Sequence, residues 1–138
     1  MRALIDTCII IDALQSREPF KDNAEKIFLL VANHSFDGFI TAKSATDIYY
    51  LTHRLTHSDP NTRKILSKIF SLFSPLDTTG IDCKKAILSE MSDYEDAVMV
   101  ETAIRSDMDC IVTRNQKDYT KASLPVYSPD EFIHCFDL

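Results

Sequence analysis

Short apolar runs alternate along the chain with longer segments in which apolar residues recur every three or four positions. The runs that predict strands cover residues 2–6, 39–41, 75–76, 109–113 and 125–127. Segments with helical spacing begin near residues 9, 19, 43, 60, 82, 94 and 129. Such alternation predicts an α/β fold in which a mostly parallel sheet is covered by helices on both faces.

Local signals place several boundaries of these elements. Pro19 is expected in the first turn of the second helix, and Asp37-Gly38 in a turn before the second strand. Ser128 followed by Pro129 and by Glu131 predicts a capping box at the start of the last helix.

Length and composition indicate one domain spanning residues 1–138. Apolar residues make up 45% of the chain, which is enough to fill a core at this length. No apolar stretch approaches the roughly 20 residues of a membrane helix, and the N-terminus lacks the parts of a signal peptide, so we expect a cytoplasmic protein with no membrane contact. The cysteines form no CxxC pair and are expected as small buried apolar side chains in a reducing compartment: Cys8, Cys83, Cys110 and Cys135.

Charge is distributed unevenly along the chain. The net charge is −6, which argues against a protein that binds nucleic acid by charge alone. Residues 41–70 nevertheless hold five basic and two acidic side chains, whereas residues 71–110 hold nine acidic and three basic ones. The first segment suits a phosphate backbone, and the acids of the second need a functional or structural explanation.

Asp6 is the first candidate functional residue because it ends a buried strand. Ligands of parallel sheets bind at the carboxyl ends of the strands, where Thr113 and Asn115 also lie after a later strand. Asp is also a good helix cap, so for Asp6 alone a structural and a functional interpretation remain equally open. Asp12, inside the first helix, is expected to be solvated.

A second group of acids precedes the helix near residue 94. The segment Ser92-Asp93-Tyr94-Glu95-Asp96 fits a helix cap, because acids favour the positive end of the helix dipole. Three acids in four residues nevertheless exceed what capping needs. Asp93 and Asp96 are spaced to point the same way, and a divalent cation, which prefers carboxylate oxygens, would relieve their repulsion.

A third polar segment, Thr113 to Tyr119, completes a pattern that resembles the PIN domain family, whose best-known members are VapC-type toxin ribonucleases. The similar segments span almost the whole chain: residues 4–7, 44–48, 93–97, 111–119 and 124–132. The resemblance implies a PIN-like three-layer α/β/α fold and cleavage of RNA with Mg²⁺ or Mn²⁺. It also implies a cognate antitoxin and a homodimer.

The same resemblance implies a role for each matching residue. Asp6 and Asp96 would be the main metal-holding carboxylates, supported by Asp93 and, directly or through water, by Asp118. Asp47 would complete the catalytic set. Thr7, Thr113 and Asn115 would orient ligands or water. When a metal is bound at such a site, it activates a water and stabilises charge on the phosphate.

Two positions depart from the family pattern. Many PIN proteins have Glu where this chain has the shorter Asp47, and Asp where it has the uncharged Asn115. Both changes weaken a second metal position. We therefore expect weak resting metal affinity, with one firm cation and a second recruited by substrate.

Several basic and aromatic residues are candidates for contacts with nucleic acid. Arg114 and Lys117 adjoin the acidic site, while Lys43 and Arg54 lie in the basic segment. Tyr49 and Tyr50 could stack on bases, although a place in the core is the alternative. His53 and His57 are spaced as a metal pair, but no third ligand is evident, so solvated histidines are favoured.

Two functional classes therefore remain. The first is a metal-dependent endoribonuclease, the toxin of a toxin–antitoxin pair. The second is a catalytically weak or inactive PIN-fold module that binds RNA or protein, as Asp47 and Asn115 permit. A phosphoryl-transfer enzyme of the haloacid dehalogenase type is disfavoured, because the second acid of its Asp-x-Asp pair is replaced by Cys8.

Overall fold

The computed structural model describes residues 1–136 and contains one parallel sheet. Its strands lie in the spatial order β3-β2-β1-β4-β5, and every neighbouring pair is parallel. The strands are β1 (Arg2–Ile5), β2 (Asp37–Thr41), β3 (Phe73–Leu76), β4 (Cys110–Val112) and β5 (Val126–Tyr127). The predicted α/β class is confirmed, and the sheet is parallel throughout.

Helices connect the strands, as parallel pairing requires. They are α1 (Thr7–Leu14), α2 (Lys21–Ala32), α3 (Ala42–Thr56), α4 (Asp59–Leu72), α5 (Gly80–Ile87), α6 (Tyr94–Arg105), the 3₁₀ helix η1 (Gln116–Tyr119) and α7 (Pro129–His134). The capping box predicted for Ser128 and Glu131 is present at the start of α7. Pro19 lies before α2 rather than in its first turn, so that prediction is wrong.

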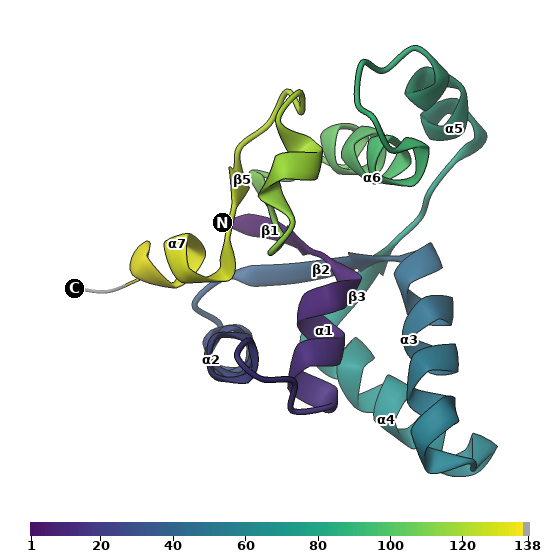
Figure 1. The fold of residues 1–138 in the computed structure, drawn as a ribbon, viewed down its shortest axis with the longest axis vertical. Helices are drawn as coiled ribbons and strands as arrows, with labels where there is room; N and C mark the ends of the chain where they lie inside the picture. The colour runs from purple at the N-terminus through teal and green to yellow at the C-terminus, as the bar shows by residue number, and fades with distance from the viewer. Residues whose placement is uncertain (137–138) are drawn as a thin grey trace.

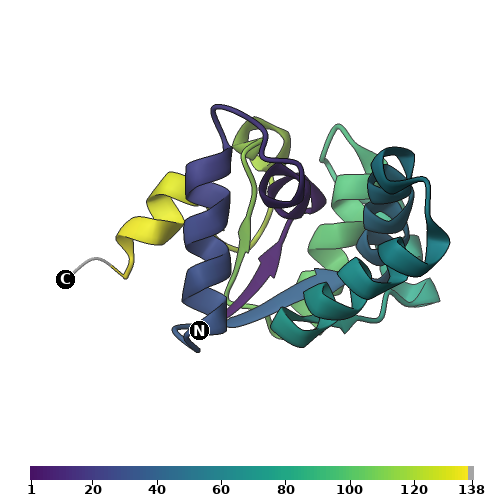
Figure 2. The ribbon, with the colours of Figure 1, turned by 90° about the horizontal axis from the view of Figure 1, so that it is seen from below.

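The sheet has a helical layer on each face (Figure 1). Side chains alternate along β1, so Ala3 and Ile5 join the core beneath α1, α2, α3 and α4, whereas Leu4 joins a second core beneath α6. Helix α7 packs beside α2 on the first face, which Figure 2 shows from below. These layers confirm the predicted three-layer α/β/α arrangement.

Gly38 lies within β2, although Asp37-Gly38 was expected as a turn. A Cβ at this position would lie 2.7 Å from Cδ1 of Phe73 and 2.9 Å from Cγ2 of Val31. The residue is therefore glycine because α2 and β3 approach the strand closely there, and the turn prediction is wrong.

The cysteines are all unpaired, but they are not all buried. Cys110 is buried and Cys8 and Cys83 are partly buried, as expected, whereas Cys135 is exposed on the far end of the chain. None of the helices in residues 1–136 combines the length and the apolar character that crossing a membrane would require.

The strand order places a crevice at one edge of the sheet. From β1 the chain continues to β2 and β3 on one side, and later returns to β4 and β5 on the other. Ligands of such sheets bind at this reversal, outside the carboxyl ends of the two central strands. Asp6 follows β1 there, and its amide donates to Val112 O of β4 at 3.0 Å.

Candidate active site

Asp6 occupies the cap position of α1 without capping the helix. Its side chain accepts no hydrogen bond from the helix backbone. Instead, the Thr113 hydroxyl donates to Asp6 Oδ2 across 2.7 Å. The structure thus decides against capping by this carboxylate, whose orientation is set by a neutral donor from the end of β4.

Asp93 and Asp96, at the start of α6, make different hydrogen bonds and have different roles. Asp93 Oδ1 accepts from the Asp96 amide at 2.9 Å, so the capping interpretation is correct for Asp93. Asp96 instead accepts from the hydroxyl of the buried Tyr119, with 3.0 Å between that oxygen and Asp96 Oδ1. Each of the two main candidate ligands, Asp6 and Asp96, is therefore held by one hydroxyl, and its other oxygen makes no hydrogen bond within residues 1–136.

The electrostatics of Asp96 show that the carboxylates lie near one another. Burial raises its pKa to about 6, the Tyr119 hydrogen bond opposes the rise, and the negative charges of Asp93, Asp6 and Asp118 add to it. The structure thus brings together four of the five acids predicted from the sequence, all except Asp47. Accumulated negative charge of this kind is relieved by a bound cation.

The oxygen donors suit a hard cation that keeps part of its water shell. Among residues 1–136, no three His, Cys, Asp or Glu side chains are placed so that they could hold a metal together. Mg²⁺ commonly needs fewer, since it retains several waters and takes one or two carboxylates. Asp6 and Asp96 could supply those two, with Asp93 and Asp118 contributing charge or contacts through water.

Cys8 contributes no thiolate to this site. Burial, followed by the nearby charge of Asp6, raises the pKa of the Cys8 thiol to about 12. The side chain is therefore neutral near pH 7 and is not a nucleophile or a soft metal ligand.

Thr7 joins the site to the start of α3. Its hydroxyl forms a hydrogen bond with the hydroxyl of the buried Ser44, whose amide donates to Thr41 Oγ1, the cap of α3, at 3.1 Å. Ser44 was not among the site residues predicted from the sequence. Its position in a segment that resembles the PIN family, 44–48, was the available signal.

Asp47 differs from the other candidate acids because a neighbouring cation already balances its charge. Lys43 Nζ lies 2.8 Å from Asp47 Oδ2 and also pairs with Glu95 of α6. Hydrogen bonds to Asp47 and then to Glu95 raise the pKa of Lys43. Lys43 thus links α3 to α6, and the charge of Asp47 is compensated without a metal.

Asp12 was expected to be solvated, and this prediction is wrong. Its side chain is buried and forms a two-point ion pair with Arg114, whose Nε and Nη2 lie 2.8 and 3.2 Å from the two carboxylate oxygens. The ring of Phe20 covers the guanidinium at 4.1 Å. Arg114, proposed from the sequence to contact nucleic acid, therefore anchors the segment after β4 to α1.

The rest of that segment forms a compact frame. The Asn115 amide donates to Thr113 Oγ1 at 3.1 Å, and the Asp118 amide donates to Asn115 O at 3.0 Å. Lys117 is exposed and has no ion pair within the described chain, so it keeps its charge available to a ligand. Tyr119 was not predicted as a site residue, because nothing in a single sequence says that its hydroxyl reaches α6.

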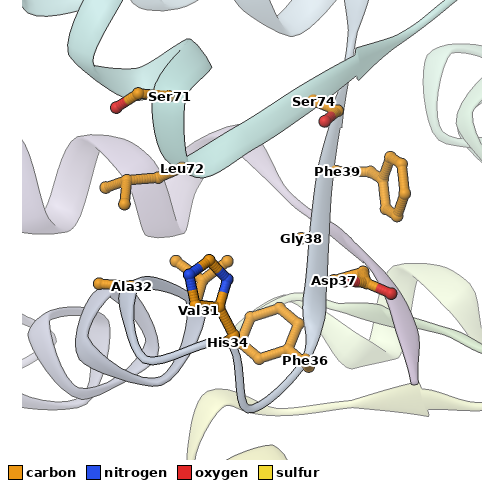
Figure 3. A pocket seen from close by; sticks show the side chains of 10 residues that line it. All are labelled: Val31, Ala32, His34, Phe36, Asp37, Gly38, Phe39, Ser71, Leu72 and Ser74. Atoms are coloured by element: carbon orange, nitrogen blue, oxygen red, sulfur yellow. The ribbon is translucent and has the colours of Figure 1, made fainter.

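A separate pocket of about 370 Å³ lies at the opposite end of the sheet (Figure 3). It opens around Asp37 and Gly38 at the start of β2, beside His34 and the β3 residue Ser74. The acidic site instead follows the last residues of β1 and β4. The pocket brings no second carboxylate to Asp37, so it does not belong to the acidic site.

Comparisons with solved structures show chains of the same fold. One is a toxin–antitoxin complex from Klebsiella pneumoniae, with 22% identity, a TM-score of 0.66, and coverage of 92% of this chain and 97% of that chain. Another is VapBC2 from Rickettsia felis bound to a DNA fragment from their promoter, with 17% identity, a TM-score of 0.65, and coverage of 93% and 98%. A third is DNA-bound VapBC from Salmonella typhimurium, with 15% identity, a TM-score of 0.67, and coverage of 94% and 98%.

Comparison of the sequence with curated proteins found no match. The family model described as PIN domain matches residues 2–117, which include β1 through β4, Asp6 after β1, Asp93 and Asp96 at the start of α6, and the beginning of η1. The chain therefore belongs to the PIN domain family.

Proposed function

We propose that the protein is a divalent-metal-dependent endoribonuclease that hydrolyses RNA phosphodiester bonds. The observation that carries this proposal is the gathering of Asp6, Asp93, Asp96 and Asp118 at the switch point of the sheet, where burial and then the charges of the other three acids raise the pKa of Asp96 to about 6. Mg²⁺ or Mn²⁺, when bound there, would supply an activated water and stabilise charge on the phosphate.

The surrounding residues would fix the site before substrate arrives. Thr113 and Tyr119 each hold one oxygen of a candidate ligand, and the second oxygen of Asp6 and of Asp96 makes no hydrogen bond within residues 1–136. Such hydrogen bonds orient metal ligands. Asp12 and Arg114 hold the segment that carries Thr113, while Lys117 would attract the phosphate backbone.

The direct test is cleavage of a structured RNA with and without Mn²⁺. We expect Mn²⁺-dependent endonucleolytic products from the wild-type protein and none from Asp6→Asn or Asp96→Asn. Asp22→Asn, on the exposed surface of α2, is the matched control and should cleave normally. Cleavage that persists in EDTA, or in both site variants, would contradict the proposal.

A second candidate function is a PIN-fold binding module with little catalysis. The specific observation in its favour is the Lys43–Asp47 ion pair, which neutralises the charge of Asp47. The uncharged Asn115 further lowers the negative charge of the site. RNA binding without cleavage, equally strong in wild type, Asp6→Asn and Asp96→Asn, would identify such a module.

We further propose that the protein is the toxin of a toxin–antitoxin pair and forms a homodimer in the cytoplasm. Similarity to chains from solved VapBC and toxin–antitoxin complexes supports the first part. Growth arrest on expression, relieved by the product of an adjacent gene, is the expected outcome. Light scattering of the purified protein measures the dimer, and growth unaffected by expression would count against the toxin assignment.

A further inference from the structure

Lys43 lies at the start of α3 and places its ammonium between two carboxylates. Its Nζ lies 2.8 Å from Oδ2 of Asp47, one turn further along α3, and it also pairs with Glu95 in the first turn of α6. Helices α3 and α6 belong to opposite layers of the fold (Figure 1), so these three residues, the bridging cluster, join the two layers. One positive charge is therefore shared by two negative ones.

The bridging cluster adjoins the acidic site at both helix starts. On α6, Glu95 directly precedes Asp96, one of the two main candidate ligands. On α3, the residue after Lys43 is Ser44, whose hydroxyl forms a hydrogen bond with that of Thr7, the first residue of α1. The charges of the cluster thus act on a cation in the site over a short range, without belonging to its ligands.

The net charge of the bridging cluster depends on its lysine. With one ammonium and two carboxylates it carries −1, and without the ammonium it would carry −2. Electrostatic attraction between charges near a protein surface extends over several ångströms and weakens as salt is added. A divalent cation held by Asp6 and Asp96 would consequently be attracted more strongly if the lysine were absent.

We propose that Lys43 limits the affinity of the resting site for Mg²⁺ or Mn²⁺ by neutralising one of the two carboxylates beside it. This inference rests on the proposed ribonuclease function and adds the residue that sets how tightly the metal is held. Lys43 acts through Asp47 and Glu95 and is itself neither a metal ligand nor a phosphate contact. Because Mg²⁺ is commonly bound by one or two carboxylates together with substrate phosphates, firm metal binding then depends on the substrate.

The ion pairs of the bridging cluster contribute little to the stability of the fold. The side chains of Lys43, Asp47 and Glu95 are 53%, 41% and 63% exposed. Ion pairs between side chains this exposed are weak, because water screens their charges. Variants at Lys43 should therefore fold, and circular dichroism checks that they do.

The first test is Mn²⁺ binding to the apo protein, followed by electron paramagnetic resonance at low ionic strength. We expect Lys43→Met, which keeps most of the side chain and removes its charge, to bind Mn²⁺ about tenfold more tightly than the wild type. Lys43→Arg keeps the charge and should bind as the wild type does. The matched control is Lys26→Met, which removes an exposed charge from α2, a helix that carries none of the candidate ligands.

A second variant separates charge from the loss of the link between α3 and α6. Lys43→Met combined with Asp47→Asn also lacks the link, but its cluster has the original net charge of −1. We expect its Mn²⁺ affinity to return to that of the wild type. In about 1 M salt, where the screening length is about 3 Å, the difference between Lys43→Met and the wild type should fall below about twofold.

Equal Mn²⁺ affinity in Lys43→Met and Lys43→Arg would overturn the inference. Tight binding that persists in the double variant, or that is unchanged in high salt, would also overturn it, because the link rather than the charge would then be responsible. If the wild type binds Mn²⁺ and cleaves RNA while the Lys43 series is uniform, the role of Lys43 alone is rejected. Absence of saturable Mn²⁺ binding from every protein of the series rejects the proposed function as well.

Discussion

Asp6 and Asp12 stand near the two ends of α1, yet their surroundings differ in charge. Asp12 is buried and neutralised by Arg114 through two hydrogen bonds. Asp6 has no ion pair within residues 1–136 and is held only by the neutral hydroxyl of Thr113. The protein itself balances the charge of an acid that has a cationic partner. An acid that has only neutral donors and acidic neighbours is instead stabilised by binding a cation. This difference separates a structural acid from a candidate catalytic one.

The largest expected effect is a loss of catalysis when Asp6 or Asp96, the acids without a cationic partner, is replaced. We expect Asp6→Asn and Asp96→Asn each to reduce Mn²⁺-dependent RNA cleavage by about a thousandfold, because a metal supplies several kcal/mol of charge stabilisation in the transition state. Circular dichroism should show a retained fold. Less than a tenfold loss in either variant would remove the distinction between Asp6 and Asp12.

Replacing Asp12, the acid that is paired with Arg114, should instead lower the stability of the fold. Asp12→Ala leaves the guanidinium of Arg114 without its partner, and we expect a loss of about 3 kcal/mol in the free energy of unfolding. Urea titration measures this loss, with Asp22→Ala on the surface of α2 as the control. An Asp12→Ala protein as stable as the control would show that the ion pair is not what holds the segment after β4.

The hydroxyl that holds Asp6 allows a finer test. We expect Thr113→Val, which keeps the shape and removes the donor, to weaken Mn²⁺ binding by about ten- to a hundredfold, as changes behind a metal ligand commonly do. Thr113→Ser keeps the hydroxyl and should retain most of the affinity. Calorimetric titration distinguishes the two, and equal affinities in the Val and Ser variants would refute the role given to this hydroxyl.

The raised pKa of Asp96 predicts a gain in stability from the same substitution that removes activity. Its ordinary value of 3.8 applies in the unfolded chain and about 6 in the fold, so the fold binds more protons between these values and loses stability as pH rises through them. Because the side chain is partly exposed, solvent screening limits the effect, and we expect Asp96→Asn to stabilise the protein by about 1 kcal/mol at pH 7.5.

At pH 4 the same substitution should have almost no effect, since the native carboxyl is then protonated in the fold. Thermal unfolding at the two pH values measures the difference. A gain at pH 4 as large as at pH 7.5 would mean that burial and the acidic neighbours do not raise the pKa of Asp96 in the fold.

The smallest effect is expected at Asp47, whose charge Lys43 already balances. We expect Asp47→Asn to reduce cleavage by less than about threefold, because the ion pair it loses is on the surface and contributes little. A loss as large as that of Asp96→Asn would show that Asp47 is a ligand in the active state and that Lys43 moves away.

The local patterns in the sequence predicted most of the fold. Short apolar runs and capping signals placed the strands and the last helix, and Asp6 and Thr113 directly follow two of these strands, as predicted. Gly38 was misjudged because its role depends on Phe73 and Val31, which approach it from other elements. Local patterns report backbone preferences, but they do not report which distant side chains come together.

The same limit explains what was missed at the site. The Asp12–Arg114 pair joins residues 102 positions apart, and the Tyr119–Asp96 hydrogen bond joins α6 to η1. Family resemblance marked the acids, since these lie in recurring segments, but it did not reveal which acids the protein neutralises itself. That information required the fold.

Mn²⁺ binding to the apo protein, followed by electron paramagnetic resonance, tests the central claim most directly. We predict weak, saturable binding of one Mn²⁺ by the wild-type protein and by the surface variant Asp22→Asn, with loss of this binding in Asp6→Asn and in Asp96→Asn. Saturable binding of equal strength in all four proteins, or none in the wild-type protein, would contradict the assignment of the uncompensated acids to a metal site.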